Sequence, residues 1–272
     1  MYVIGAYLLS ANVVKITMIR KCSPPAPLQL LLEVNQSKKL AIPLLQHSVV
    51  KCPWFFAAKC DFVGYFALTS GNKEMEELIS RNNKGLPQAF LLRTDKPLPQ
   101  VPVPVKLHDA RVLPDGPRKH KLAVCLQPVY LLADWTLLVQ FFEIWIAQGA
   151  TKFYMYIQSM APEVDALLRV YEHSSDLDVE RVEWGSLPTA DANPGKNDPN
   201  LRMFRMEAIT SINDCLLRSR GHAKYVAIMD LDEIVVTYTD RTVLEMLERM
   251  RNASKNLVAF IFRSSFVHYK IG

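Results

Sequence analysis

Three acidic residues interrupt an apolar stretch late in the chain, and their spacing suits a metal ion. The segment 224–236 reads KYVAIMDLDEIVV, with acids at Asp230, Asp232 and Glu233. Side chains two apart on a strand share a face, so Asp230 and Asp232 can converge while Glu233 points elsewhere. Two converging carboxylates suit Mg²⁺ or Mn²⁺, which take oxygen ligands and share them with phosphates. A metal held there could neutralise a nucleoside-diphosphate leaving group.

The same acids have two other interpretations. Asp230 and Asp232 could cap the following turn and pair with Lys or Arg. An apolar strand that ends in Asp-x-Asp also resembles the motif of haloacid-dehalogenase-type phosphatases, whose first Asp is a nucleophile and whose second is an acid/base. In this chain only residues 233–272 follow Asp232, and this segment is too short for the rest of that fold. The position of the motif therefore favours the metal–diphosphate interpretation.

The segments that must position these acids predict an α/β domain. After residue 118, strand-like runs alternate with helix-like runs, which indicates a Rossmann-like, mostly parallel sheet with helices on both faces. Ligands bind beyond the carboxyl ends of the strands in such sheets, and we expect a central, buried strand at 224–229 to end at the acids. The expected strands are 121–126, 152–157, 178–184, 224–229 and 257–269, and the expected helices lie between Asp134 and Gly149, from Pro162 onward, and at 201–220 and 242–252.

Local signals fix the bounds of some of these elements. Asp134 is expected to cap the first helix and Gly149 to end it. Trp135 and Trp145 have helical spacing on that helix, so both are expected in the core. Turn residues dominate 185–200, which we expect to be a loop.

The first part of the chain has a different sequence pattern, rich in strand-like runs and proline. Residues 1–118 are expected to form a small β-rich module with a short helix at 73–81, and residues 119–272 to form the α/β domain. The segment 94–118 holds proline at a density that sustains neither a helix nor a central strand, so we expect an extended connector that ends the module.

Charge and cysteine spacing limit the classes of ligand and partner that the chain is expected to bind. The net charge is +5, but the chain has no dense basic run and no basic stretch interleaved with aromatics, so no nucleic-acid partner is expected. None of the five cysteines forms a Cys-x-x-Cys pair, which argues against a structural zinc site. Cys125 and Cys215 are expected as core residues, while one disulfide is expected among the cysteines at 22, 52 and 60.

Two further features bear on the cellular compartment. Asn35 and Asn252 begin Asn-x-Ser triplets and are candidate glycosylation sites, a weak indication of a secretory-pathway lumen. The apolar N-terminus is interrupted by Asn12 and Lys15 and does not read as a membrane-spanning helix of about 20 residues. Its β-branched residues predict a first pair of strands instead.

Three stretches in the second half of the chain together resemble a glycosyltransferase family 92 domain. They are LLVQFFEIWIAQGATKFYMYIQS (137–159), INDCLLRSR (212–220) and KYVAIMDLDEIVV (224–236). The opening YVIGAYLLSANVVKI (2–16) resembles the family's first strand more weakly. The resemblance extends over residues 120–270, and the ordered trio is more specific than any one piece.

The resemblance implies a GT-A-like fold that moves a hexose, expected to be galactose, from a UDP-sugar donor to a glycan or glycoprotein acceptor. It implies that Asp230 and Asp232 bind Mn²⁺ (or Mg²⁺) and that Glu233 is a further donor-binding acid. It implies a place on the lumenal side of the Golgi membrane. The alternative is a catalytically inactive glycan-binding or scaffold module of the same fold.

Gln127, Tyr130 and Asp214 are the remaining donor-binding candidates. Gln127 and Tyr130 follow the first strand, where a GT-A-like fold meets the nucleotide base, so Tyr130 either stacks on uracil or is a buried tyrosine with a satisfied hydroxyl. Asp214 lies in an Asn-Asp-Cys run that resembles the family's, and either supports the donor site or makes helix–helix hydrogen bonds. The family's membrane anchor, second half and general base have no match here, so we expect a domain that is incomplete at the C-terminus.

Overall fold

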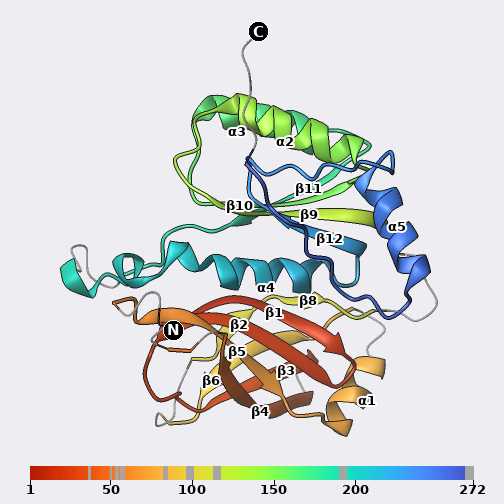
Figure 1. Ribbon diagram of the computed structural model, residues 1–272. Helices are drawn as coiled ribbons and strands as arrows, with labels where there is room; N and C mark the ends of the chain where they lie inside the picture. The colour runs from red at the N-terminus through yellow and green to blue at the C-terminus, as the bar shows by residue number, and fades with distance from the viewer. Residues whose placement is uncertain are drawn as a thin grey trace.

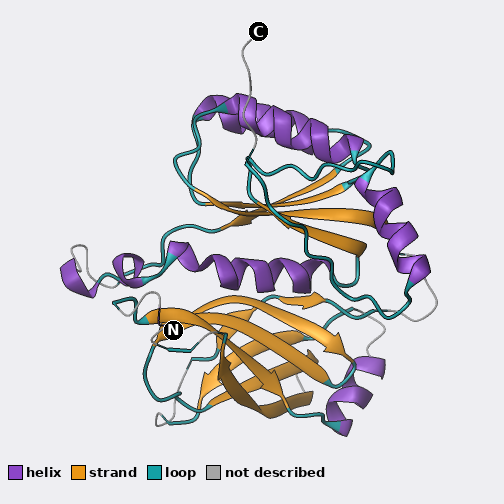
Figure 2. Cartoon of the chain, in the orientation of Figure 1, coloured by secondary structure: helices purple, strands orange, loops and turns teal. Residues whose placement is uncertain are grey.

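The computed structural model describes most of the chain. The described residues are 1–35, 38–49, 51–52, 55, 59–81, 85–95, 101–112, 118–189 and 195–266. They form two sheets, one rich in antiparallel pairs and one parallel, with the helix α4 between them (Figures 1 and 2).

The N-terminal part is an eight-stranded sheet that curls into a near-barrel (Figure 1). Its order is β7-β6-β3-β4-β5-β2-β1-β8, and every pair is antiparallel except β1 with β8. Alternate apolar side chains fill its interior, as expected for strands with one face inward. The elements are β1 (Tyr2–Ser10), β2 (Val13–Lys21), β3 (Leu28–Asn35), β4 (Lys38–Ser48), β5 (Phe62–Thr69), α1 (Lys73–Arg81), β6 (Gln88–Arg93), β7 (Val103–Val105) and β8 (Leu107–Asp109).

The expected connector 94–118 contributes two strands to this sheet. Its described part is extended, and β7 and β8 form the two ends of the sheet order. An end strand tolerates Pro104, because one side of that strand has no ladder to complete. The segment is therefore partly built into the N-terminal sheet.

The second part is a four-stranded, all-parallel sheet of order β11-β10-β9-β12. Helices α2 and α3 cover one face, and α4 lies on the other, between the two sheets (Figure 1). The strands are β9 (His120–Val129), β10 (Lys152–Ile157), β11 (Asp178–Glu183) and β12 (Ala223–Met229), and the helices are α2 (Trp135–Ala147), α3 (Pro162–Glu172), α4 (Ala208–Ser219) and α5 (Val243–Ala253), with the 3₁₀ turns η2 (Gly195–Asn197), η3 (Pro199–Arg202) and η4 (Arg205–Glu207).

The caps of α2 follow the sequence signals. Asp134 accepts a hydrogen bond from the backbone N–H of Thr136, and Gly149, with φ of +96°, takes the left-handed conformation that ends the helix. Trp145 is buried in the core, as expected. Trp135 is 54% exposed, so its assignment to the core is wrong: it is the first residue of α2, and the buried residues of this helix begin at Leu138.

Three strand and helix predictions are also wrong. The strand β12 pairs with β9 alone and lies at the sheet edge, although we expected it in the centre. Its apolar residues are explained by the cores that it covers on both faces. The described part of 257–269, residues 257–266, contains no strand. The helix expected at 201–220 begins at Ala208, because Arg205 and Glu207 have left-handed backbones that an α-helix excludes.

Two disulfides join distant segments. Cys22 bonds to Cys52, which confirms one disulfide among the three loop cysteines, and Cys60 keeps a free thiol. Cys125 and Cys215 are buried in the core as expected, but they also bond to each other and tie β9 to α4. Disulfides are typical of oxidising compartments, so the chain has the features of a secretory-pathway domain. No described helix has the length and apolarity to cross a bilayer.

Candidate active site

The candidate site lies at the carboxyl end of β12, beside strand β9. Leu126 of β9 pairs with Met229, the last residue of β12, so Gln127 lies beside Asp230, the first residue after β12. The prediction that Gln127 follows the first strand is wrong, because β9 continues to Val129. The Gln127 side-chain amide donates to Asp230 Oδ1 over 2.6 Å. The structure thus brings together two predicted donor-site residues that are 103 positions apart in sequence.

The acids themselves lie in a turn, because β12 ends at Met229. The N–H of Glu233 donates to the Asp230 carbonyl over 3.2 Å, and the N–H of Asp230 donates back to the Glu233 carboxylate over 3.3 Å. The strand alternation from which we expected Glu233 to point elsewhere therefore does not apply. Glu233 closes the turn that presents Asp230 and Asp232.

Negative charge accumulates at this turn. Asp230 is exposed, but partial desolvation raises the pKa of its carboxyl above the ordinary value, the nearby carboxylates of Glu233 and Asp232 raise it further, and the positive charge of Arg205 opposes the rise. A nearby cation favours the charged form of such a carboxyl, because it offsets the repulsion from the like charges.

The oxygen donors fit Mn²⁺ or Mg²⁺ as an incomplete set. Both ions prefer carboxylate oxygens and share their coordination with phosphates and water. Within the described ranges no three His, Cys, Asp or Glu side chains are placed as a ready metal site. Binding of a metal ion by Asp230 and Asp232 stays a prediction, in which a phosphate ligand would have to fill the remaining coordination positions.

Arg205 belongs to a segment with an unusual backbone. Arg205 and Glu207 have φ of +45° and +58°, a left-handed conformation that non-glycine residues seldom adopt. Glu207 is 6% exposed and accepts hydrogen bonds from the Gly64 N–H over 2.8 Å and from the Thr210 hydroxyl over 2.9 Å. Burial raises the pKa of the Glu207 carboxyl, although these two hydrogen bonds oppose the rise.

The N-terminal sheet holds this segment in place. Besides the Gly64–Glu207 bond, Asp61 forms an ion pair with Arg202, and Phe62 forms an isolated parallel bridge with Met203. Strained backbone persists where its surroundings determine it, and such strain gathers at functional sites. No local sequence signal points to Arg205, because the contacts that hold its segment come from residues 61–64, far away in the chain.

Tyr130 is exposed to solvent at the carboxyl end of β9. It follows β9, and 62% of it is accessible to solvent, so the interpretation as a buried tyrosine is wrong. The adjacent Leu131 has φ of +50° and is held by a hydrogen bond from its N–H to the Ser159 hydroxyl. Stacking of Tyr130 on a base stays a prediction.

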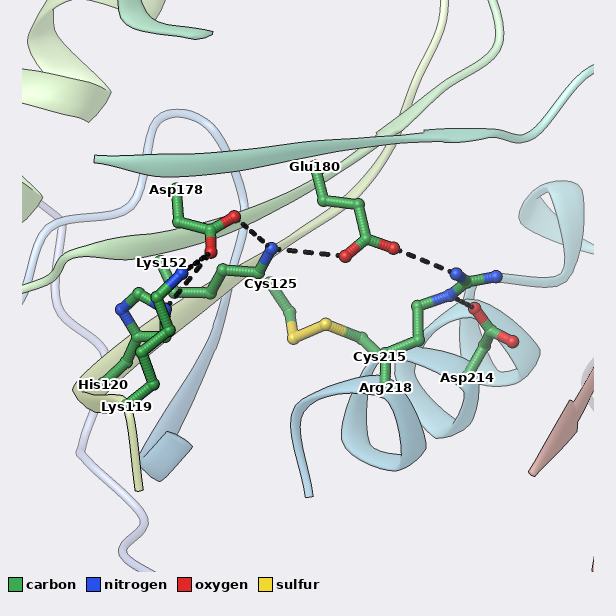
Figure 3. A network of polar contacts seen from close by, with 9 residues as sticks. All are labelled: Lys119, His120, Cys125, Lys152, Asp178, Glu180, Asp214, Cys215 and Arg218. Atoms are coloured by element: carbon green, nitrogen blue, oxygen red, sulfur yellow. Dashed lines mark hydrogen bonds and ion pairs between the residues drawn. A yellow bond between two sulfur atoms is a disulfide. The ribbon is translucent and has the colours of Figure 1, made fainter. Parts of the chain in front are cut away.

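Asp214 lies in a buried polar network between the two sheets (Figure 3). It accepts hydrogen bonds from the hydroxyl of Tyr7 on β1, from the hydroxyl of Tyr156 on β10 over 2.6 Å, and from Arg218 over 2.6 Å. Burial and the Asp214 charge raise the pKa of both tyrosines, which stay neutral donors. These bonds join α4 to both sheets, and none of these partners belongs to the Asp230 turn. A donor-binding role for Asp214 stays a prediction.

The network continues along the parallel sheet. Arg218 also pairs with Glu180 over 3.0 Å, Glu180 with Lys152 over 3.2 Å, and Lys152 with Asp178 over 2.7 Å (Figure 3). Burial opposes ionisation of Asp178, but hydrogen bonds from Lys119 and Lys152 outweigh it and hold its pKa well below the usual range. The buried charges are thus paired, which is the condition for keeping them in the interior.

The remaining predicted positions are not part of this site. Asn252 lies exposed on α5, where a glycan has access. The Asn35 side chain and Ser37 fall outside the described residues.

Comparisons with known proteins bear on residues 120–271, which match the model of glycosyltransferase family 92. A family 92 protein of Caenorhabditis elegans is 27% identical over 116 residues, covering 42% of this chain and 22% of its own length. The beta-1,4-galactosyltransferase galt-1 of the same organism is 22% identical over 156 residues, covering 57% and 34%. The chain therefore spans about a third or less of these relatives. A solved cyclomaltodextrinase structure matches with 8% identity over 55% of this chain and 30% of its own, and its TM-score of 0.24 carries no argument.

Proposed function

Because the chain belongs to glycosyltransferase family 92, we propose that it takes part in metal-dependent transfer of a hexose from a UDP-sugar to a glycan or glycoprotein acceptor. Galactose is the proposed sugar, since a relative that matches over more than half of this chain is named a galactosyltransferase. The observation that carries the proposal is the turn of carboxylates beyond β12, at the carboxyl edge of the parallel sheet.

In this proposal each residue of the turn has a distinct task. Asp230 and Asp232 would hold Mn²⁺ (or Mg²⁺), which supplies neutralisation of the diphosphate as it leaves. Gln127 donates to Asp230 Oδ1 and so fixes the orientation of that carboxylate. Glu233 holds the turn closed through the Asp230 backbone. Arg205 adds a positive charge on the same side, suited to phosphate oxygens.

The compartment follows from the same proposal. Glycan transfer with UDP-sugars takes place in the secretory pathway by family resemblance, and we propose the Golgi lumen. The two disulfides support an oxidising lumen, and the exposed Asn252 is available for glycosylation there.

Ligand protection of the fold tests the donor site directly. UDP with Mn²⁺ is expected to raise the melting temperature of the wild-type chain. A ligand at a hundred times its Kd stabilises the native state by about 2.7 kcal/mol. At about 2–4 °C per kcal/mol, the expected shift is about 5–10 °C. The shift should vanish in Asp232→Ala and persist in Asp176→Ala, which changes an exposed aspartate after α3.

The other outcomes separate the alternatives. A well-folded sample whose melting temperature responds to neither UDP nor Mn²⁺ lacks the proposed donor site. Glycan binding without any response to UDP indicates the inactive glycan-binding module. Phosphatase turnover that is lost in Asp230→Asn indicates the haloacid-dehalogenase-type chemistry.

A further inference from the structure

A cleft of about 320 Å³ lies between the two sheets, away from the Asp230 turn. Residues of the parallel sheet form one side, where β10 and β11 end, and residues of β1 and β2 form the other. Volumes near this value are typical of small-ligand pockets. The residues that matter here are Val3, Ile4, Ile19, Gln158, Trp184 and Ser186.

Its position relates the cleft to the proposed reaction. The cleft lies at the carboxyl end of β11, and the Asp230 turn lies at the carboxyl end of β12, on the opposite edge of the same sheet. The order β11-β10-β9-β12 separates them by three strand spacings, about 14 Å at roughly 4.8 Å each. An oligosaccharide bridges that separation, whereas a single hexose does not. A ligand in the cleft is therefore remote from the sugar that is transferred.

The walls of the cleft combine apolar and polar surfaces. Val3, Ile4 and Ile19 supply an aliphatic wall from the N-terminal sheet. Trp184 is 7% exposed and packs edge-on against Tyr156 at 5.2 Å, so only a small part of its surface is accessible to a ligand. A pyranose ring has the matching surface, with C–H groups on its faces and hydroxyls around its edge.

Two polar side chains of the cleft, Gln158 and Ser186, can each form a hydrogen bond to a sugar hydroxyl. The Gln158 amide donates to the Ser186 hydroxyl over 3.4 Å, near the limit of a hydrogen bond, so both groups can exchange this contact for a sugar hydroxyl. Asn200 fixes the loop beside them, because it accepts from the Leu187 N–H over 2.7 Å and donates to the Leu187 carbonyl over 3.0 Å. The loop is thus held in shape beside Gln158 and Ser186, which both line the cleft.

Charge selects a neutral ligand over an anionic one. Two arginines line the cleft, but Arg181 is paired with Asp165 and Glu172, and Arg218 with Asp214 and Glu180. Their positive charge is therefore already balanced, and a phosphate or an acidic sugar gains little there.

We propose that this cleft is a subsite for a neutral hexose unit of the acceptor glycan, remote from the transferred sugar. The inference rests on the proposed function. The N-terminal sheet supplies one wall of the cleft, so it takes part in acceptor choice.

Binding of oligosaccharides tests the subsite without turnover. The probes are a panel of neutral tetrasaccharides including lacto-N-tetraose, free galactose, and an anionic heparin tetrasaccharide, measured by calorimetry and saturation-transfer NMR. Wild type is expected to bind a neutral tetrasaccharide more tightly than galactose and than the anionic probe. Ser186→Trp, which fills the mouth, and Gln158→Ala, which removes the amide, are each expected to weaken tetrasaccharide binding about tenfold or more, which is about 1.4 kcal/mol.

The matched control is Ser175→Trp, the same change at an exposed serine in the turn after α3. Both tryptophan variants should keep the wild-type melting temperature and its shift with UDP and Mn²⁺. The subsite is refuted if no neutral tetrasaccharide binds wild type, or if Ser186→Trp binds as well as Ser175→Trp. If UDP and Mn²⁺ still protect the fold in those cases, the proposed function stands without the subsite. Tetrasaccharide binding that is lost in Ser186→Trp, with no UDP effect, supports the cleft and refutes the donor site.

Discussion

Replacing Gly64 with alanine is expected to separate the N-terminal sheet from α4. A Cβ at this position would lie 1.9 Å from the Thr210 hydroxyl oxygen and 3.2 Å from the Glu207 carboxylate. Real Cβ atoms keep at least about 3.0 Å, so the sheet and the helix must move apart by about 1 Å. Thr210 is fully buried on α4, which leaves its side chain little room to yield.

The expected loss of stability has two parts. Overpacking of this kind costs about 1–3 kcal/mol. The shift also breaks the hydrogen bond from Gly64 to Glu207, and the buried Gly64 N–H donor left unsatisfied costs about 1–3 kcal/mol more. Alanine also lowers the conformational entropy of the unfolded chain, which stabilises the folded state by about 0.4–1 kcal/mol. The net loss is therefore about 1–6 kcal/mol, a large fraction of a typical stability of about 5–15 kcal/mol.

Thermal denaturation followed by circular dichroism measures this loss. At about 2–4 °C per kcal/mol, Gly64→Ala should melt several degrees lower than wild type. Gly71→Ala is the matched control, since its Cβ would meet nothing closer than the Asn12 amide at 3.8 Å, and its melting temperature should not fall. In a double-mutant cycle, Thr210→Ala removes the clashing oxygen, so the two changes together should destabilise by less than the sum of the single changes. Equal melting temperatures for wild type and Gly64→Ala would refute the tight packing of β5 on α4.

Two more predictions concern buried groups. The folded pKa of Glu207 is raised by burial, so its contribution to stability is present at low pH and is lost as pH rises from the ordinary glutamate value through the raised one. Glu207→Gln does not titrate, so the melting temperature of wild type relative to this variant should fall as the pH rises above about 4, the ordinary glutamate value; a constant difference would contradict the burial of that charge. Replacing Cys125 and Cys215 with alanine should cost about 2–5 kcal/mol in denaturant unfolding, while Cys60→Ala should leave the unfolding midpoint near that of wild type. An unchanged midpoint in the double variant would show that the disulfide does not restrain the unfolded chain.

Features with local causes could be predicted from the sequence. The cap at Asp134 and the stop at Gly149 bounded α2, because each acts within a few residues. The alternation of strands and helices predicted the parallel sheet, and the apolar run before Asp230 predicted a strand that ends there.

Features with distant causes could not be predicted in this way. The edge position of β12 depends on which strands pair, and its apolar residues suit an edge strand between two cores as well as a central one. The left-handed conformation of Glu207 depends on the N–H of Gly64, 143 positions earlier. Cys125 and Cys215 are 90 positions apart and carry no local pattern that distinguishes a disulfide from two core thiols. Contact between Gln127 and Asp230 likewise requires the register of β9 against β12.

The packing of α4 indicates that the N-terminal sheet and the parallel sheet function as one unit. Asp214 bonds to Tyr7 of one sheet and to Tyr156 of the other, so the helix between them is fixed from both sides. The segment that leads into α4 carries Arg205 toward the Asp230 turn and is held by Gly64. A change at the contact between Gly64 and α4 would therefore move the positive charge of Arg205 relative to the Asp230 turn. Gly64 itself is not one of the proposed donor-binding residues. Gly64→Ala should accordingly reduce the protection by UDP and Mn²⁺ at temperatures where the variant is still folded, whereas Gly71→Ala should keep it in full.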